Sequence, residues 1–195
     1  MARMLYSATM SLDGFIAGPG GDMSWLTSYL GPNPTADGLV DQIGALLIGR
    51  RTFGGDDPNR GTDKEGPFGG AWTGPQFVLT HQIPGAAQVS EHRSERGAER
   101  TVATPGITFL DDLDAAVAAA KAAAGEKYVN ILGADVARQC LQAGVLDEIL
   151  VFLAPVLLGD GVRLLDQPGG TNVRLERLSL SQAPLATGVW FRVLG

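Results

Sequence analysis

The chain has 195 residues, of which 45% are hydrophobic and 18% are charged, so its composition predicts a folded protein with a sizeable core. A formal net charge of -6 argues against DNA or RNA as a partner, because nucleic-acid affinity depends on many clustered Lys and Arg side chains. One cysteine, Cys140, and two histidines cannot make an internal disulfide or a typical zinc site. The sequence therefore predicts a cytoplasmic protein without a metal.

The N-terminal residues lack the charged opening, long apolar stretch and cleavage site of a secretory signal. No apolar segment approaches the roughly 20 residues that a membrane-spanning helix needs. We expect no membrane partner and a single domain over residues 1–195.

The first predicted strand covers Met4 to Thr9 and runs into an Asp13-Gly14 turn. The glycine-rich string "GPGGDMSW" then predicts a flexible loop over a cleft, because glycine and proline interrupt regular structure. A short helix from Asp37 to Gly44 and a second strand from Ala45 to Ile48 follow.

The second strand ends in the string Gly49-Arg50-Arg51-Thr52. Two guanidinium groups and a hydroxyl at a strand end are suited to binding phosphate, since arginine stays charged and matches phosphate oxygens geometrically. The alternative is an ordinary strand end followed by a solvated helix start. A bound nucleotide is the first hypothesis.

The middle of the chain begins with an irregular stretch from Gly54 to Pro75, which we interpret as an active-site flap or an interface loop. We expect its aromatic residues Phe68 and Trp72 to be exposed. Strands are predicted at residues 76–80, 98–103 and 107–110, and a helix over the string "LDAAVAAAKAAA". Aspartates 111, 112 and 114 favour the start of that helix, and Gly125 favours its end.

A strand from Tyr128 to Leu132 ends at Gly133 and leads into a helix over residues 135–143. A strand, a glycine and a helix start make a second anion-binding arrangement, because the first N-H groups of a helix have no partners within it. Strands over residues 149–158, 173–180 and 188–194 complete the pattern, the last two as an antiparallel pair. The order predicts an α/β fold with a mainly parallel sheet flanked by helices and with antiparallel edge strands.

Several strings occur in an order that resembles a known family. "SLDGFIA", "LLIGRRTF", "FVLTH", "VNILGADVARQ" and "LDEILVFLAPVLLGDGVRLL" are similar to the reductase (RibD C-terminal) domain of bacterial bifunctional riboflavin-biosynthesis proteins, over nearly the whole chain. The resemblance implies a dihydrofolate reductase-like fold, NADPH as the cofactor and a homodimer.

The resemblance also implies cofactor-binding roles for two groups of residues. Gly49, Arg50, Arg51 and Thr52 would hold the phosphates of NADPH, and Thr80 and His81 would flank its adenosine end. Further along the chain, Gly133, Ala134, Asp135 and Val136 would hold the pyrophosphate, and Gly159 would allow a tight turn near the nicotinamide. Ala134 stands where the family usually has a glycine, which narrows the site.

On the substrate side the resemblance points to Asp13 as the catalytic or substrate-orienting acid and to Trp25 as a substrate cover. Asp13 could instead cap nearby backbone N-H groups as an ordinary turn residue, and Trp25 could simply anchor its loop. The pair Asp147-Glu148, which precedes the long apolar strand, is typical of a structural position.

The leading hypothesis is an NADPH-dependent reductase that transfers hydride to a C=N or C=O bond of a small heterocyclic substrate resembling a pterin, a pyrimidine or a riboflavin precursor. A non-catalytic nucleotide-binding or regulatory protein is one alternative. A relative that uses a flavin or a deazaflavin is another. A deaminase activity is excluded, because the zinc signature that it needs contains more than one cysteine.

Overall fold

The computed structural model describes residues 1–55, 57, 59–82, 90–94, 97–104, 106–170 and 172–195. Its main feature is a sheet of ten strands in the order β11-β12-β9-β1-β8-β3-β4-β7-β6-β5. The six central strands run parallel; they are β9 (Glu148–Ala154), β1 (Met4–Ser11), β8 (Tyr128–Leu132), β3 (Ile43–Gly49), β4 (Gln76–Leu79) and β7 (Ile107–Leu110). The predicted parallel centre is confirmed.

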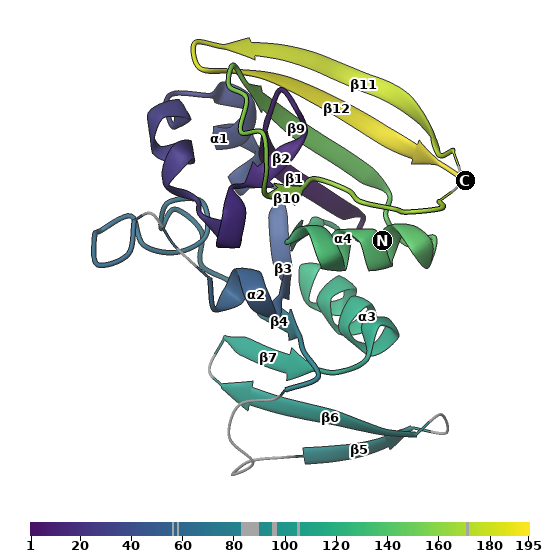
Figure 1. Cartoon of the computed structure of the whole chain (residues 1–195). Coiled ribbons are helices and arrows are strands. Elements are labelled where there is room, and N and C mark those ends of the chain that lie inside the picture. The colour runs from purple at the N-terminus through teal and green to yellow at the C-terminus, as the bar shows by residue number, and fades with distance from the viewer. Residues whose placement is uncertain (56, 58, 83–89, 95–96, 105, 171) are drawn as a thin grey trace.

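Antiparallel strands extend the sheet at both ends (Figure 1). At one end the C-terminal hairpin of β11 (Arg174–Ala183) and β12 (Ala186–Leu194) pairs with β9, and at the other β6 (Gly97–Thr104) and β5 (Ser90–Ser94) continue from β7. The C-terminal antiparallel pair and the edge strand near residues 98–103 were both predicted, whereas β5 was not.

A separate two-stranded sheet joins β2 (Phe15–Ala17) to β10 (Val162–Arg163), which lies far along the chain. Gly161 lies so close to β2 that a Cβ atom there would sit 2.0 Å from the Ala17 carbonyl oxygen. A glycine is therefore required at this crossing, and the pairing brings the loop that follows β9 next to the loop that follows β1.

Helices cover the two faces of the main sheet. Helices α3 (Leu113–Ala124) and α4 (Ala134–Gln142) contribute to one core cluster, together with alternate residues of the central strands such as Tyr6, Leu47 and Ile131. Helix α1 (Pro34–Val40) contributes Leu39 to a second cluster on the other face. We call these the α3/α4 face and the α1 face. The fourth helix is the short α2 (Arg50–Phe53), which begins directly after β3.

Several predicted boundaries were wrong, three of them near the candidate site or at a proline. The helix expected from Asp37 begins at Pro34, because the Asn33 side chain accepts hydrogen bonds from the backbone N-H groups of Thr35 and Ala36. β3 begins at Ile43, within the stretch expected to be helical. The strand expected to reach residue 158 ends at Ala154, since Pro155 has no N-H to donate.

The aromatic residues of the loop over residues 54–75 are more buried than predicted. Trp72 was expected to be exposed, but it is only 8% exposed, and its indole N-H donates to the Ile43 carbonyl oxygen at 3.2 Å. Phe68 is partly buried against the same core cluster on the α1 face. The described part of this loop is therefore anchored to the sheet through its aromatic residues.

Cys140 is fully buried in α4, and burial raises the pKa of its thiol to about 12. No helix within the described ranges has the length and apolar character that a membrane crossing requires.

Candidate cofactor and substrate site

The two predicted anion-binding strings meet at the carboxyl ends of β3 and β8. Gly133 has φ +111°, and a Cβ atom there would lie 2.6 Å from the Thr52 hydroxyl oxygen. A Cβ at Gly49 would lie 3.1 Å from a methyl group of Val136. The strings 49–52 and 133–136 thus form one continuous surface, although 80 residues lie between them in the sequence. Their predicted roles rest on this proximity and on the chemistry of each group.

The start of α4 has no side-chain cap, unlike the starts of α1 and α3. Asp112 caps α3 by accepting from the Ala115 N-H at 2.8 Å, and Asn33 caps α1. At α4 the preceding residue is Gly133, and no side chain caps the helix. Its first N-H groups, including those of Ala134 and Asp135, are therefore available to a bound anion, and the helix dipole favours negative charge there.

The Asp135 side chain turns back onto its own helix instead of closing that helix start. Arg138 donates to one carboxylate oxygen at 2.5 Å and Gln139 donates to the other at 2.9 Å. The hydrogen bond from Arg138 is the largest cause that holds the Asp135 pKa below its usual range, and Arg51 adds a smaller through-space contribution. Asp135 therefore stays ionised and partly offsets the positive field of α4.

The two arginines have different surroundings. Arg50 donates to the Gln82 carbonyl oxygen at 2.8 Å, which ties α2 to the turn after β4. Arg51 is exposed and makes no hydrogen bond or close ion pair with other described residues. Arg51 is thus the better placed of the two to meet a phosphate, while Arg50 would have to exchange one existing bond.

Thr80 shapes the turn to which Arg50 is tied. Thr80 is 5% exposed, its N-H donates to the Leu110 carbonyl oxygen at 2.7 Å, and its hydroxyl exchanges hydrogen bonds with the backbone of Gln82. His81 lies exposed at the same turn. His81 is therefore accessible to solvent, whereas the Thr80 hydroxyl holds the backbone of the turn.

Asp13 lies at the carboxyl end of β1 and links the two loops that flank it. Its carboxylate accepts hydrogen bonds from the Ser11 hydroxyl (2.6 Å), the Leu158 N-H (3.1 Å) and the Gly159 N-H (2.7 Å). These bonds, led by that from Ser11, lower the Asp13 pKa to about 2. Asp13 is therefore a permanently charged hydrogen-bond acceptor that also caps backbone N-H groups, and Gly159 is positioned by it.

Trp25 lies in the short helical segment Ser24–Tyr29, where its ring is 6.0 Å from that of Tyr29. The indole N-H is buried and has no hydrogen-bond partner within the described ranges. Both interpretations of Trp25, a substrate cover and a loop anchor, stay open on this geometry.

Sequence reasoning missed a row of hydroxyl side chains on β1. Ser7 donates to the Asn130 side-chain oxygen at 2.8 Å, and Ser11 donates to Asp13. The signal was present in the string "YSATMSLD", where every second residue from Ser7 is polar.

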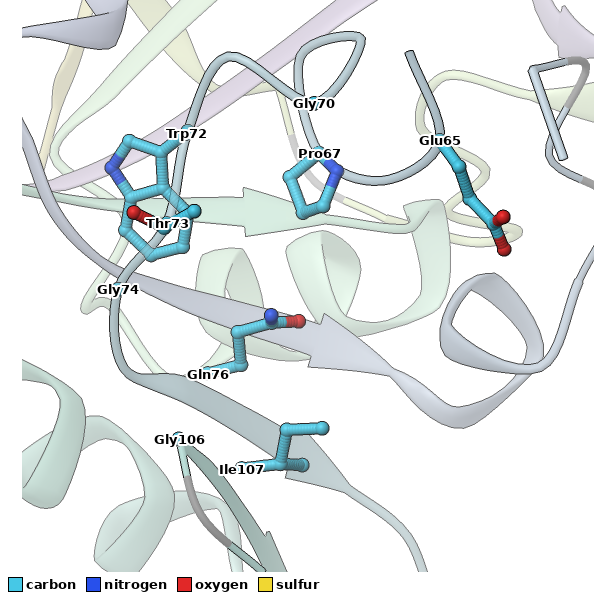
Figure 2. A pocket seen from close by; sticks show the side chains of 9 residues that line it. All are labelled: Glu65, Pro67, Gly70, Trp72, Thr73, Gly74, Gln76, Gly106 and Ile107. Carbon is cyan, nitrogen blue, oxygen red and sulfur yellow. The ribbon is translucent and has the colours of Figure 1, made fainter. Parts of the chain in front are cut away.

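A pocket of about 610 Å³ lies elsewhere, at the amino-terminal starts of β4 and β7 (Figure 2). Gln76 and Ile107 come from those strand starts, and Pro67 and Trp72 come from the preceding loop. Because the strands run parallel, this pocket is at the opposite edge of the sheet from Gly49. It is not part of the candidate cofactor surface.

Comparisons with known proteins agree with the fold and its order of motifs. Residues 3–185 match the model of the RibD C-terminal domain. The chain is similar to the solved structure of a putative riboflavin biosynthesis protein from Shewanella sp. PV-4, with 20% identity, full coverage of both chains and a TM-score of 0.71. No curated protein sequence matches the chain.

Two further structures are similar at lower identity. The deaminase/reductase of Thermotoga maritima, named as a diaminohydroxyphosphoribosylaminopyrimidine deaminase and 5-amino-6-(5-phosphoribosylamino)uracil reductase, shares 16% identity and a TM-score of 0.65; the match covers 99% of this chain and 57% of that one. A pyrimidine reductase-like protein of Corynebacterium diphtheriae shares 16% identity and a TM-score of 0.61, with 100% and 92% of the chains covered. The dihydrofolate reductase-like α/β fold is confirmed.

Proposed function

The chain belongs to the RibD C-terminal domain family, a family of reductases, and from this premise we propose that it is an NADPH-dependent reductase of a small heterocyclic substrate. The observation that carries the proposal is the meeting of Gly49, Thr52 and Gly133 beside a helix start without a side-chain cap. A surface of glycines, a hydroxyl and free N-H groups allows a pyrophosphate to approach the backbone closely.

The residues present fit the phosphates of NADPH. Gly133 leaves space that a Cβ would fill, the first N-H groups of α4 are uncapped, and the exposed Arg51 guanidinium lies near enough to influence Asp135. We assign the pyrophosphate to α4 and Thr52, and the additional phosphate that distinguishes NADPH from NADH to Arg51, with Arg50 as a second cation. When bound, NADPH supplies the hydride.

On the substrate side, Asp13 acts as a fixed negative charge and hydrogen-bond acceptor. Its pKa of about 2 makes it a poor proton donor at neutral pH, so we assign the proton that accompanies hydride transfer to water. Asp13 instead orients a substrate N-H or O-H group and holds the loop with Gly159 at the carboxyl edge of β1.

The proposal includes a homodimer in the cytoplasm. The outer strand β11 exposes Leu175, Leu178 and Leu180 at 43%, 38% and 58%, and a row of exposed leucines on an edge strand is suited to pairing with a second copy. Light scattering of the purified protein tests this, and a Leu180→Glu variant should shift the mass toward that of a monomer. A wild-type protein that stays monomeric at all concentrations would contradict it.

The decisive experiment is a titration of the purified protein with NADPH and with NADH, followed by quenching of tryptophan fluorescence. We expect tighter binding of NADPH and a loss of about 10- to 100-fold in its affinity when Arg50 and Arg51 are both replaced by Ala, because charge-assisted bonds to phosphate are removed. An Arg174→Ala/Arg177→Ala variant removes the same charge from exposed positions on β11 and should bind normally.

Failure of the wild-type protein to bind either nucleotide at millimolar concentration would overturn the proposal. An absorbance spectrum of the purified protein then shows whether a flavin or a deazaflavin is bound in place of NADPH. If NADPH binds, its oxidation in the presence of a panel of amino-substituted pyrimidines and pterins tests for turnover.

A further inference from the structure

The α1 face of β1 is polar along its carboxyl-terminal half, although β1 is a central strand. Residues Met4, Tyr6, Ala8 and Met10 point to the α3/α4 face and pack with its core. The alternate residues Ser7, Thr9 and Ser11 point to the α1 face, in line with Asp13 at the strand end. The neighbouring positions on β9 are apolar, since Ser7 pairs with Leu150 and Thr9 pairs with Phe152. The hydroxyl row is therefore a local exception within an apolar face.

The hydrogen bonds at the two ends of this row determine the direction in which each hydroxyl proton points. The Ser7 hydroxyl donates toward Asn130 at 2.8 Å, and the Ser11 hydroxyl donates toward Asp13 at 2.6 Å. Both protons therefore point away from Thr9. A hydroxyl has one proton and two lone pairs, and Ser11 also accepts from the Phe15 N-H. Ser7 is left with an oxygen that can accept a further hydrogen bond.

Asn130 is a costly residue at its position. It is fully buried on β8 between Leu5 of β1 and Leu46 of β3, and its side-chain NH₂ group has no partner within the described residues. A leucine of similar size would avoid an unsatisfied buried amide. Among the described residues the Asn130 side chain makes one hydrogen bond, which it accepts from Ser7, so the function that the amide can serve is to orient the Ser7 hydroxyl.

Thr9 is the accessible member of the row. Ser7 is 8% exposed and Ser11 is fully buried, whereas Thr9 is partly exposed and its hydroxyl makes no hydrogen bond with other described residues. Two residues further along, Ser11 contacts Asp13, which holds the loop with Gly159. Phe152, the pairing partner of Thr9 on β9, lies beside Thr9 on the α1 face and places an aromatic ring next to the hydroxyl row.

We propose that Thr9 and Ser7 are specificity-determining residues that bind the N-H edge of the substrate's ring, and that Asn130 is a positioning residue that holds the Ser7 oxygen as an acceptor. The inference rests on the proposed reductase function and deepens it. The row selects rings with adjacent amino or imino donors over rings of the same shape without them, because an acceptor that loses its partner on binding weakens the complex.

The test uses two probes of nearly the same shape, triaminopyrimidine and trimethylpyrimidine, with binding to the full chain measured by calorimetry in the absence of nucleotide. We expect the wild-type protein to prefer the triamino ring. Thr9→Val keeps the shape of the side chain and should reduce that preference about fivefold, the effect of one lost hydrogen bond. The matched control is Thr108→Val, on β7 and facing the α3/α4 face, which should leave the preference unchanged.

Asn130→Leu separates positioning from structure. If Asn130 orients Ser7, this variant keeps or raises the melting temperature and still loses part of the preference for the triamino ring; a purely structural role would lower the melting temperature and leave the preference intact. Equal binding of the two probes by the wild-type protein, binding of neither, or a preference that survives Thr9→Val would overturn the inference. A separate NADPH titration of the same samples reports on the proposed function, so the two can fail independently.

Discussion

The two edges of the parallel sheet use polar groups in opposite ways. At the amino-terminal edge Glu148 is 1% exposed and accepts hydrogen bonds from Arg3 (2.5 Å), Tyr128 (2.9 Å) and Trp190 (2.8 Å). The Arg3 guanidinium also lies over the Tyr128 ring at 4.7 Å from its centre. Every group in this cluster has a partner from the chain itself, so the predicted structural role of the Asp147-Glu148 pair is confirmed for Glu148.

At the carboxyl-terminal edge the corresponding groups are left open. Helix α4 starts without a side-chain cap, Arg51 is exposed without a close partner among the described residues, and Gly133 keeps space clear beside Thr52. The difference teaches that the chain satisfies its buried charge at one edge with its own side chains, whereas at the other edge it leaves donors exposed, where the proposed nucleotide would supply the partner.

The largest expected effect comes from filling the open edge. Gly133→Ala places a Cβ 2.6 Å from the Thr52 hydroxyl at a backbone conformation reserved for glycine, and we expect a loss of about 3 kcal/mol in stability and a loss of about 100-fold in NADPH affinity. Denaturant unfolding and fluorescence titration measure the two. Gly125→Ala is the matched control, because it also has positive φ but meets open space; it should bind NADPH normally.

Glu148→Gln disturbs the hydrogen-bonded cluster at the amino-terminal edge and should affect stability without affecting nucleotide binding. Whichever way the amide turns, its new NH₂ group faces a donor, either Arg3 or the pair Tyr128 and Trp190. We therefore expect a loss of about 2–3 kcal/mol in the free energy of unfolding with unchanged NADPH affinity. Glu176→Gln breaks an ion pair with Arg192 in which both side chains are about half exposed and should change stability by less than about 1 kcal/mol. A Glu148→Gln protein that folds normally but fails to bind nucleotide would contradict the assignment of stability to the amino-terminal edge and of nucleotide binding to the carboxyl-terminal edge.

Asp112→Ala removes the cap of α3 and makes its start resemble that of α4. We expect a loss of about 1 kcal/mol in stability, measured by thermal unfolding, since the Ala115 N-H loses its acceptor. Nucleotide affinity should not change. A gain in anion binding at the start of α3 would show that an uncapped helix start is sufficient to bind an anion. It would also show that the glycines and arginines near α4 contribute little to the affinity.

The smallest effect concerns pH. The Asp13 pKa is lowered from 3.8 to about 2 in the folded protein, so its ionised form stabilises the fold above about pH 4 and this contribution disappears as the pH falls toward 2. Asp13→Asn should therefore flatten the acid side of a plot of melting temperature against pH. Between pH 5 and 9 the variant should turn over more slowly with a pH profile of unchanged shape. A limb near neutral pH that vanishes in Asp13→Asn would instead identify Asp13 as a proton donor.

Local signals in the sequence were enough for most elements. The α3 helix, with its aspartate cap, alanine-rich body and terminal glycine, and the strands β7 and β8 have the predicted bounds. The start of α1 was misplaced although Asn33-Pro34 is a recognisable cap and first turn. Pairings between distant segments, such as β2 with β10, leave no local signal, because neither short strand would form without the other.

The candidate site was predictable in part for the same reason. Gly49 and Gly133 each follow an apolar strand, and parallel strands bring their carboxyl ends to one edge. The burial of Trp72, the tie between Arg50 and Gln82 and the hydrogen bonds that occupy Asp13 depend on side chains that meet across the fold. Spacing along the chain contains no information on such contacts.

The position of β1 has a consequence for how the protein is made. β1 is the first strand of the chain, yet its two neighbours are β8 and β9, which end at residues 132 and 154. As the ribosome extends the chain, β1 has neither partner until β8, at residues 128–132, has been added. Such long-range closure slows folding and leaves unpaired strand edges open to aggregation. We therefore expect β1 to pair stably only after β8 and β9 have left the ribosome.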